Sequence, residues 1–395
     1  MVANQNKLAT LFNIHPGEGR LVTLLLAYSF FIGAARIFTR SAAMGLFLSQ
    51  YSAGELPYVY IGISVIVTAL SYVYLRLGQK LTLSRLLAVT LIFLLASLLL
   101  FWGGLSISQS GTLVFILPIW YEVLWTLTSL AFWNLAGRLL NVRQGKRLFA
   151  FVNSGEAVSI LLGGLLVPVL VQIGSTTDLL LAAAASVFCI LLILGAISRS
   201  FSHQLDLPLE KASTEAAGSA KTVFKSHYVL LLCSLFGIVV LVYFFIDAIF
   251  YAQAEIRYPT QESLTAFVGV FFGVIGFLGL LTRLFVVGWL IDRFGVRITA
   301  LVGPVVIATL VALLALAGTF STLLLVIFGL ASLTKMFNLL LFDSTDIAAI
   351  NIFYQPLSPA RRTQVQTLVE GIVYPLAVGL AGVAGRCARV SDRLQ

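Results

Sequence analysis

Long apolar stretches separated by short polar gaps recur along almost the whole chain. Crossing the hydrocarbon core of a bilayer takes roughly 20 residues of α-helix, and most of these stretches have about that length. They predict a first group of six spans, at Leu21–Phe47, Leu56–Leu75, Leu86–Leu105, Leu113–Ala136, Phe149–Val171 and Leu179–Ile197. They predict a second group of five, at Tyr228–Gln253, Leu264–Ile291, Thr299–Ala317, Thr322–Phe342 and Thr363–Ala384. The pattern therefore predicts an all-α polytopic membrane protein with about eleven transmembrane helices.

A polar segment rich in Ser, Ala, Glu and Lys, at 198–227, separates the two groups. It is long for a connection between helices, so we interpret it as a linker. The expected division is an N-terminal six-helix bundle at 1–197, the linker, and a C-terminal bundle at 228–395. The second bundle is one helix short, which favours truncation of a six-plus-six protein, with a re-entrant last span as the alternative.

Composition and charge support this interpretation. The chain is 59% hydrophobic and 10% charged, against the roughly 25% charged residues of a soluble domain, which excludes a water-soluble fold. The net charge of +9 does not indicate a nucleic-acid partner, because no basic binding module accompanies it. Basic residues fall in alternate gaps, where cytoplasmic loops carry them, so the N-terminus and the linker are expected on the cytoplasmic side. These residues are Arg76, Lys80, Arg85, Arg138, Arg143, Lys146, Arg147, Arg293, Arg297, Arg361 and Arg362.

Motifs of enzymes and of metal sites are missing from the sequence. The chain has three Cys and three His, with neither a disulfide framework nor the spacing of a metal site. All three histidines lie outside the predicted spans. We therefore expect no enzyme activity, no cofactor and no metal.

The sharpest short motif is G-W-L-I-D-R-F-G-V-R at 288–297, which resembles the G-x-L-x-D-R-x-G-x-R signature of the major facilitator superfamily. This resemblance implies a two-bundle fold whose halves alternate in exposing a central cavity. Asp292, Arg293 and Arg297 are the candidate gating residues, because such a charge cluster can bridge neighbouring helix ends in one state. The corresponding gap at 75–85 lacks the Gly and Asp of the signature.

A second resemblance is more specific. E-V-L-W at 122–125, A-F-W-N-L-A at 131–136, G-K-R-L-F at 145–149 and L-F-D-S-T at 341–345, the last preceded by Lys335, resemble the nucleotide transporter (ATP/ADP translocase) family of plastids and intracellular bacteria.

Two positions depart from this family's pattern. Ala43 stands where the family has a lysine in the first span, and Asn338 stands at the second basic position of the tenth. The opening segment, 15–40, is more similar to functionally obscure bacterial relatives of the family. The resemblance therefore implies a multi-pass protein of the inner (plasma) membrane of a bacterium.

Charged residues inside the predicted spans are the candidate site, because a charge at the bilayer centre costs about 2.5–3.5 kcal/mol on insertion scales. They are Arg36, Arg40, Glu122, Glu156, Asp247, Arg283, Lys335, Asp343 and Glu370. In the major facilitator plan the first, fourth, seventh and tenth spans line the cavity. The resemblance therefore implies a substrate-binding set of Arg36, Arg40, Glu122, Asp247 and Lys335. Glu156 is interpreted as a residue near a helix end, and Arg283 as a side chain that reaches toward the cytoplasm.

The expected site has three cations against two carboxylates and is net positive. It favours a small anionic solute, with ATP or ADP implied by the family resemblance, carried by a secondary transporter through alternating access. Glu122 and Asp247 would hold the cations in the empty site or carry a proton. The alternative is that all five residues form salt bridges without a ligand. The protein would then be a non-transporting membrane scaffold or sensor with an unknown protein partner.

Overall fold

The computed structural model describes residues 15, 18–108, 110–201, 205, 226–319, 324–342, 353, 354, 357, 365 and 368–394. Of these it describes only the backbone at 142, 143, 145–147, 150, 283, 284, 287, 288, 291, 292, 296, 297, 300, 370, 371 and 388–394.

The six spans predicted in the first part of the chain are confirmed, one helix for each. The observed elements are α2 (Gly19–Gln50), the short η1 (Ala53–Glu55), α3 (Leu56–Gly78), α4 (Leu83–Ile107), α5 (Gly111–Leu139), α6 (Val142–Ile173) and α7 (Asp178–Ser200). The helices are a few residues longer than the predicted apolar stretches, and only α3 begins at the predicted residue. The extra residues lie in the polar interface, where a helix continues until a turn or a cap ends it.

The second part of the chain is also helical. Its elements are α11 (His227–Arg257), α12 (Gln261–Leu281), the π-helical turn η2 (Thr282–Val286), α13 (Val287–Gly318), α14 (Leu324–Leu341), the π-helical turn η4 (Val369–Val373) and α17 (Tyr374–Leu394). A break inside α13 at Gly295 (φ 75°, ψ 165°) separates the eighth and ninth predicted spans. A positive φ of this kind is readily adopted by glycine, so the glycine of the signature motif makes the turn between two spans.

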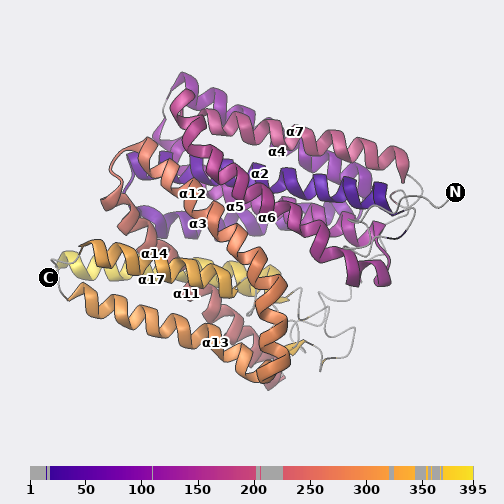
Figure 1. The fold of residues 1–395 in the computed structure, drawn as a ribbon. Coiled ribbons are helices and arrows are strands. Elements are labelled where there is room, and N and C mark those ends of the chain that lie inside the picture. The colour runs from indigo at the N-terminus through magenta and orange to yellow at the C-terminus, as the bar shows by residue number, and fades with distance from the viewer. Residues whose placement is uncertain are drawn as a thin grey trace.

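Ten helices within the described residues are long and apolar enough to cross a membrane. The eleventh predicted span falls on η4 and α17, and α17 is not among these ten. The end of α17 lies at the opposite end of the molecule from the start of α2 (Figure 1). The all-α polytopic architecture is therefore confirmed. The boundaries of the two predicted bundles stay a prediction, since most of the linker lies outside the described residues.

Local sequence explains where several helices begin. Asn141 accepts a hydrogen bond from the backbone N–H of Gln144, whose side chain accepts one from the backbone N–H of Asn141. This capping box satisfies two donors that a helix N-terminus leaves unpaired. Pro57 occupies the first turn of α3, where its missing N–H costs nothing. Thr260 accepts from the N–H of Ser263 at the start of α12.

Helices from the two parts of the chain touch through small residues. α12 packs on α6 and α2, and α17 packs on α3 (Figure 1). A methyl group added at Gly164 of α6 would lie 2.3 Å from the carbonyl oxygen of Gly269 on α12. One added at Gly382 of α17 would lie 2.5 Å from the carbonyl oxygen of Pro57 on α3. α12 thus lies against α2, which carries the buried Arg36.

Candidate functional site

Two arginines on α2, Arg36 and Arg40, are the starting point of the site. They are four residues apart, a spacing that places side chains on the same face of a helix. Arg36 is 6% exposed, and the side chain of Arg40 is 14% exposed. Despite this common position, the two guanidinium groups have different partners.

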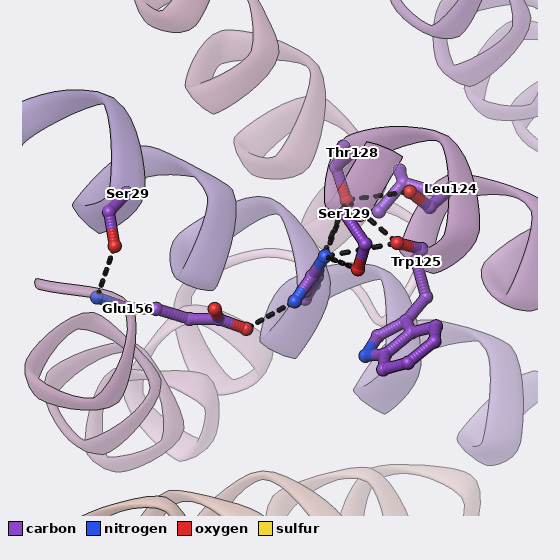
Figure 2. Close-up of polar contacts among 7 residues, drawn as sticks. Ser29, Leu124, Trp125, Thr128, Ser129 and Glu156 are labelled. Atoms are coloured by element: carbon purple, nitrogen blue, oxygen red, sulfur yellow. Dashed lines mark hydrogen bonds and ion pairs between the residues drawn. The ribbon is translucent and has the colours of Figure 1, made fainter. Parts of the chain in front are cut away.

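Arg36 is held by polar groups of α5 and α6. Its Nε and Nη2 donate to the Thr128 hydroxyl at 3.1 and 2.9 Å, and Nη2 also donates to the Ser129 hydroxyl at 2.6 Å and to the carbonyl oxygen of Trp125 at 3.0 Å. Its Nη1 forms an ion pair with Glu156. Figure 2 shows Glu156 on one side of this network and Thr128, Ser129 and Trp125 on the other. Arg36 therefore uses most of its donors within the protein.

Contrary to the prediction from the sequence, Glu156 does not lie near a helix end. It lies inside α6, with its backbone N–H donating to the Ser29 hydroxyl at 3.0 Å, rather than near a helix end. Its carboxylate is the counter-charge of Arg36. The sequence marked Glu156 as a charge within a span but assigned it no partner, because the contact joins residues 120 positions apart.

A second cluster centres on Asp247 of α11. Its Oδ1 lies 2.5 Å from Nζ of Lys335 on α14 and 3.9 Å from Nη2 of Arg40 on α2. Its Oδ2 accepts a hydrogen bond from the Tyr60 hydroxyl of α3 at 3.2 Å. Asp247 is 5% exposed and Lys335 is fully buried. Three of the predicted site residues therefore meet, and Tyr60 joins them without having been predicted.

Arg40 has weaker contacts than Arg36. The Phe272 ring centroid lies 3.4 Å from its Cζ and the Tyr121 ring centroid 5.5 Å away. Its Nε donates to the Tyr251 hydroxyl at 3.4 Å, close to the limit for a hydrogen bond. A guanidinium has five N–H donors, so Arg40 keeps donor capacity that aromatic faces do not use.

Lys335 resembles Arg40 in this respect. Its ammonium group lies 3.9 Å from the Tyr243 ring centroid and has Asp247 as its ionic partner. Beyond that contact its Nζ has no hydrogen-bond acceptor within the described part of the chain. One turn further along α14, the amide Oδ1 of Asn338 is also buried and without a hydrogen bond in the described residues. One turn of α14 thus carries both an ammonium with unused donors and an amide with an unused acceptor.

Glu122 of α5 is half-buried beside this cluster. Its carboxyl group interacts electrostatically with four charged residues, namely Arg40, Asp247, Lys335 and Arg36. Together with Glu156, the cations and carboxylates number three each: Arg36, Arg40 and Lys335 against Glu122, Asp247 and Glu156. The expectation of a net positive site is therefore wrong for the described residues, because the carboxylate of Glu156 was left out of the count.

The predicted gating residues are only partly visible. Arg293 is exposed, and its Cζ lies 5.8 Å from the Trp289 ring centroid and 5.9 Å from that of Phe294. The side chains of Asp292 and Arg297 lie outside the described residues, as do those of Arg283 and Glu370 and the whole of Asp343. The gating role of Asp292, Arg293 and Arg297, which we call the latch, stays a prediction.

The uncharged contacts of the cluster, such as Tyr60 and Phe272, were not predicted from the sequence. Uncharged aromatic residues are common in every span of this chain, so no signal in the sequence separated these two from core-filling residues. Only the arrangement of α3 and α12 around Arg40 and Asp247 identifies them.

Comparison with known proteins gives a curated relative and several similar structures. The chain is 24% identical over 284 residues to ADP,ATP carrier protein 1 of Chlamydia muridarum, which covers 61% of this chain and 52% of that protein. The chain thus spans about half the length of the curated relative it matches.

Solved structures share the fold at low identity. The nucleoside transporter NupG matches with a TM-score of 0.65 and 13% identity over 92% of this chain and 90% of its own. A bacterial homologue of the iron transporter ferroportin, in an inward-facing state, matches with a TM-score of 0.65 and 14% identity over 93% and 91%. The xylose transporter XylE from E. coli matches with a TM-score of 0.52 and 15% identity over 93% and 95%.

The sequence profile of the Major Facilitator Superfamily matches residues 134–385, which is more than half of the chain. This match includes the signature motif at 288–297 and the helices that carry Asp247 and Lys335. The fold, with its long apolar helices, agrees with the match. The chain therefore belongs to the Major Facilitator Superfamily.

Proposed function

We propose that the protein is a secondary transporter that moves a small organic anion across the membrane by alternating access. Arg40 and Lys335 bind the anionic group, and Asp247 neutralises them when the site is empty. Glu122 supplies a further carboxylate beside the site. Nucleotides such as ADP and ATP are the substrates we propose to test first.

The observation that carries the proposal is that Arg40 and Lys335 share one carboxylate, that of Asp247. An ammonium has three donors and a guanidinium five, and few of them are used here. Charge-assisted hydrogen bonds to a phosphate or carboxylate are stronger than neutral ones, and arginine binds such groups with two parallel bonds. An anion that reaches this cluster would therefore gain contacts that Asp247 alone does not make.

The position of the cluster also supports transport. Arg40 lies on α2 in the first part of the chain, whereas Asp247 and Lys335 lie on α11 and α14 in the second. Secondary transporters bind their substrates between two structural repeats and expose them by moving one against the other. Contacts between Arg40 and Asp247 would break and form during such a movement.

The choice of nucleotides rests on the relative and on the chemistry of Asn338. The curated relative is named as an ADP,ATP carrier. The unused buried acceptor of Asn338 suits a ligand that has an N–H or O–H donor as well as an anionic group. The departures at Ala43 and Asn338 remove basic side chains that the nucleotide transporter family carries, so smaller organic anions belong in the same test.

Orientation follows from the basic gaps. We place the N-terminus in the cytoplasm and the protein in the plasma membrane of a bacterium. Asp292, Arg293 and Arg297 then lie on the cytoplasmic side as a latch, with Arg293 beside Trp289.

A second candidate function is a non-transporting membrane scaffold or sensor. It is favoured by the ion pairs themselves, because Arg36 with Glu156 and Lys335 with Asp247 are already paired within the protein. On this alternative the buried charges only fix how the helices assemble.

Counterflow into proteoliposomes tests the proposal. Vesicles with the purified protein are preloaded with unlabelled ADP, ATP, inorganic phosphate or succinate, and entry of the same labelled compound is followed. We expect accumulation with at least one of the organic anions ADP, ATP and succinate, and its loss in Lys335→Met. Arg76→Gln, which removes an exposed cation near the end of α3, should transport like the parent. If the parent accumulates none of them, transport of these anions is contradicted and the scaffold function is favoured.

A further inference from the structure

The two carboxylate oxygens of Asp247 have different partners. Oδ1 faces the cations, at 2.5 Å from Lys335 and 3.9 Å from Arg40. Oδ2 accepts the hydrogen bond from Tyr60. Because a carboxylate is planar and rigid, holding one oxygen in place also sets the direction of the other. The Tyr60 hydroxyl therefore helps to keep Oδ1 directed at the two cations.

The ring of Tyr60 is fixed by packing. Tyr60 is 3% exposed, and its ring meets that of Phe244 at an angle of 67° with 4.9 Å between the centroids. Phe244 lies on α11, one turn before Asp247. α11 therefore both packs against the ring of Tyr60 and supplies the acceptor for its hydroxyl. Because the ring is fixed, the hydroxyl has little freedom to donate to another acceptor.

Tyr60 reaches Asp247 from the other part of the chain. It lies on α3 one turn after Pro57, whose carbonyl oxygen is closely approached by Gly382 of α17. The hydrogen bond between Tyr60 and Asp247 thus lies next to the contact of α3 with α17. A movement of α3 against the second part of the chain would change the distance between this hydroxyl and the carboxylate.

We propose that Tyr60 is a positioning residue of the anion site, which holds Asp247 on Lys335 and Arg40 as an internal substitute for the substrate while the site is empty. The inference rests on the proposed function, because it assumes that an anion binds these two cations. When the anion binds, Oδ1 of Asp247 leaves Lys335 and the hydrogen bond to Tyr60 breaks. The hydroxyl therefore stabilises the empty site and opposes anion binding.

Replacing Tyr60 by Phe keeps the ring and its contact with Phe244 and removes only the hydroxyl. We expect ADP and inorganic phosphate to bind the variant more tightly than the parent. A hydrogen bond to a charged group contributes enough for a change of about tenfold, so tightening of roughly three- to tenfold is expected. The measurement is equilibrium binding to the full-length purified protein in detergent, with a thermal melt to establish that the variant is folded. If Tyr60 only stabilised the fold, the folded variant would bind ADP and phosphate as the parent does or more weakly.

Tyr28→Phe is the matched control. Tyr28 is a fully buried tyrosine of α2 whose hydroxyl has no hydrogen-bond partner within the described residues, and its ring stacks on Phe132. The same chemical change there should leave the affinity for ADP and phosphate unaltered. The comparison separates the hydrogen bond to Asp247 from the loss of any buried hydroxyl.

A double-mutant cycle tests whether Tyr60 acts through Asp247. In an Asp247→Asn background the carboxylate no longer competes for the cations, so adding Tyr60→Phe should change the affinity less than about twofold. Equal tightening in both backgrounds would overturn the inference.

The failures of the two proposals can be told apart. If the parent binds ADP or phosphate and Lys335→Met does not, but Tyr60→Phe binds like the parent or more weakly, the positioning role is wrong and the anion site stands. If the parent binds neither probe, the proposed anion site is wrong and the role of Tyr60 falls with it.

Discussion

Arg36 and Arg40 are the same residue type, one turn apart on the same buried helix, but they have opposite surroundings. Arg36 donates to two hydroxyls and a backbone carbonyl and pairs with Glu156. Arg40 lies against the rings of Phe272 and Tyr121 and reaches Asp247 only at 3.9 Å. Residue type and burial alone are therefore insufficient to assign a function to either arginine.

The difference lies in how many donors remain unused. A buried guanidinium whose donors are used within the protein stabilises the assembly, and removal of one partner leaves an uncompensated charge. A guanidinium with unused donors that shares a carboxylate with Lys335 offers contacts to a ligand. We therefore propose that Arg36, which the sequence placed in the substrate-binding set, holds α2, α5 and α6 together, and that Arg40 binds the anion.

The largest expected effect concerns Arg36. Arg36→Met leaves Glu156 without its counter-charge, and breaking a buried pair in this way costs about 3–5 kcal/mol of stability. Denaturant unfolding of the purified protein in detergent measures this. The double variant with Glu156→Met should recover most of the loss. A loss below about 1 kcal/mol in the single variant would remove the structural assignment of Arg36.

Arg40→Met should affect binding more than stability. Losing a charge-assisted hydrogen bond to a ligand costs about 1.5–3 kcal/mol, which corresponds to an affinity roughly 10- to 150-fold weaker. The measurement is ADP binding alongside the unfolding experiment used for Arg36→Met. If Arg40→Met destabilises the protein as strongly as Arg36→Met and leaves ADP binding unaltered, the two arginines have the same role and the comparison fails.

Gly164→Ala tests the contact that joins the two regions, since α6 carries Glu156 and α12 carries Phe272. The added methyl would meet the carbonyl oxygen of Gly269 at 2.3 Å, and overpacking of this kind costs about 1–3 kcal/mol. Gly195→Ala on α7, where the new methyl meets nothing within 4 Å, is the control. Unfolding experiments should show a loss only for Gly164→Ala, and equal stability of both variants would contradict the close contact.

The smallest expected effect comes from Phe272→Leu. A cation over an aromatic face contributes about 0.5–1 kcal/mol at exposed sites and about 2 or more when desolvated. Replacing the ring should loosen Arg40 and weaken ADP binding by a few-fold, measured in the same binding assay. An effect as large as that of Arg40→Met would mean that Phe272 contacts the ligand itself.

Much of the fold was predictable, because the length of the apolar stretches and the polar gaps between them indicate membrane spans directly. The turn at Gly295 has a sequence signal in the glycine of the signature motif. The π-helical turn η2 has none, since hydropathy carries no information on hydrogen-bond register. The eleventh span, which falls on η4 and α17, was placed by its apolar residues alone.

The site was predictable only in part. Asp247, Lys335 and Arg40 were marked by the cost of burying a charge, and they do meet. Their partners could not be assigned, because the pairs join helices far apart in the sequence. Glu156 was therefore given no role as the partner of Arg36, and the charge count came out positive. Tyr60 carries no charge and had no signal that separated it from the other aromatic residues.

The affinity for ADP of Asp247→Asn and Lys335→Met, measured in one binding assay against the parent, tests the anion site most directly. We predict changes of opposite sign: Lys335→Met loses a cation and binds more weakly, whereas Asp247→Asn removes the internal competitor and binds more tightly, each by about tenfold. A thermal melt establishes that both variants are folded. If both variants bind ADP more weakly than the parent, or if neither differs from it, Asp247 is not a substitute for a bound anion and the proposed role of this cluster is contradicted.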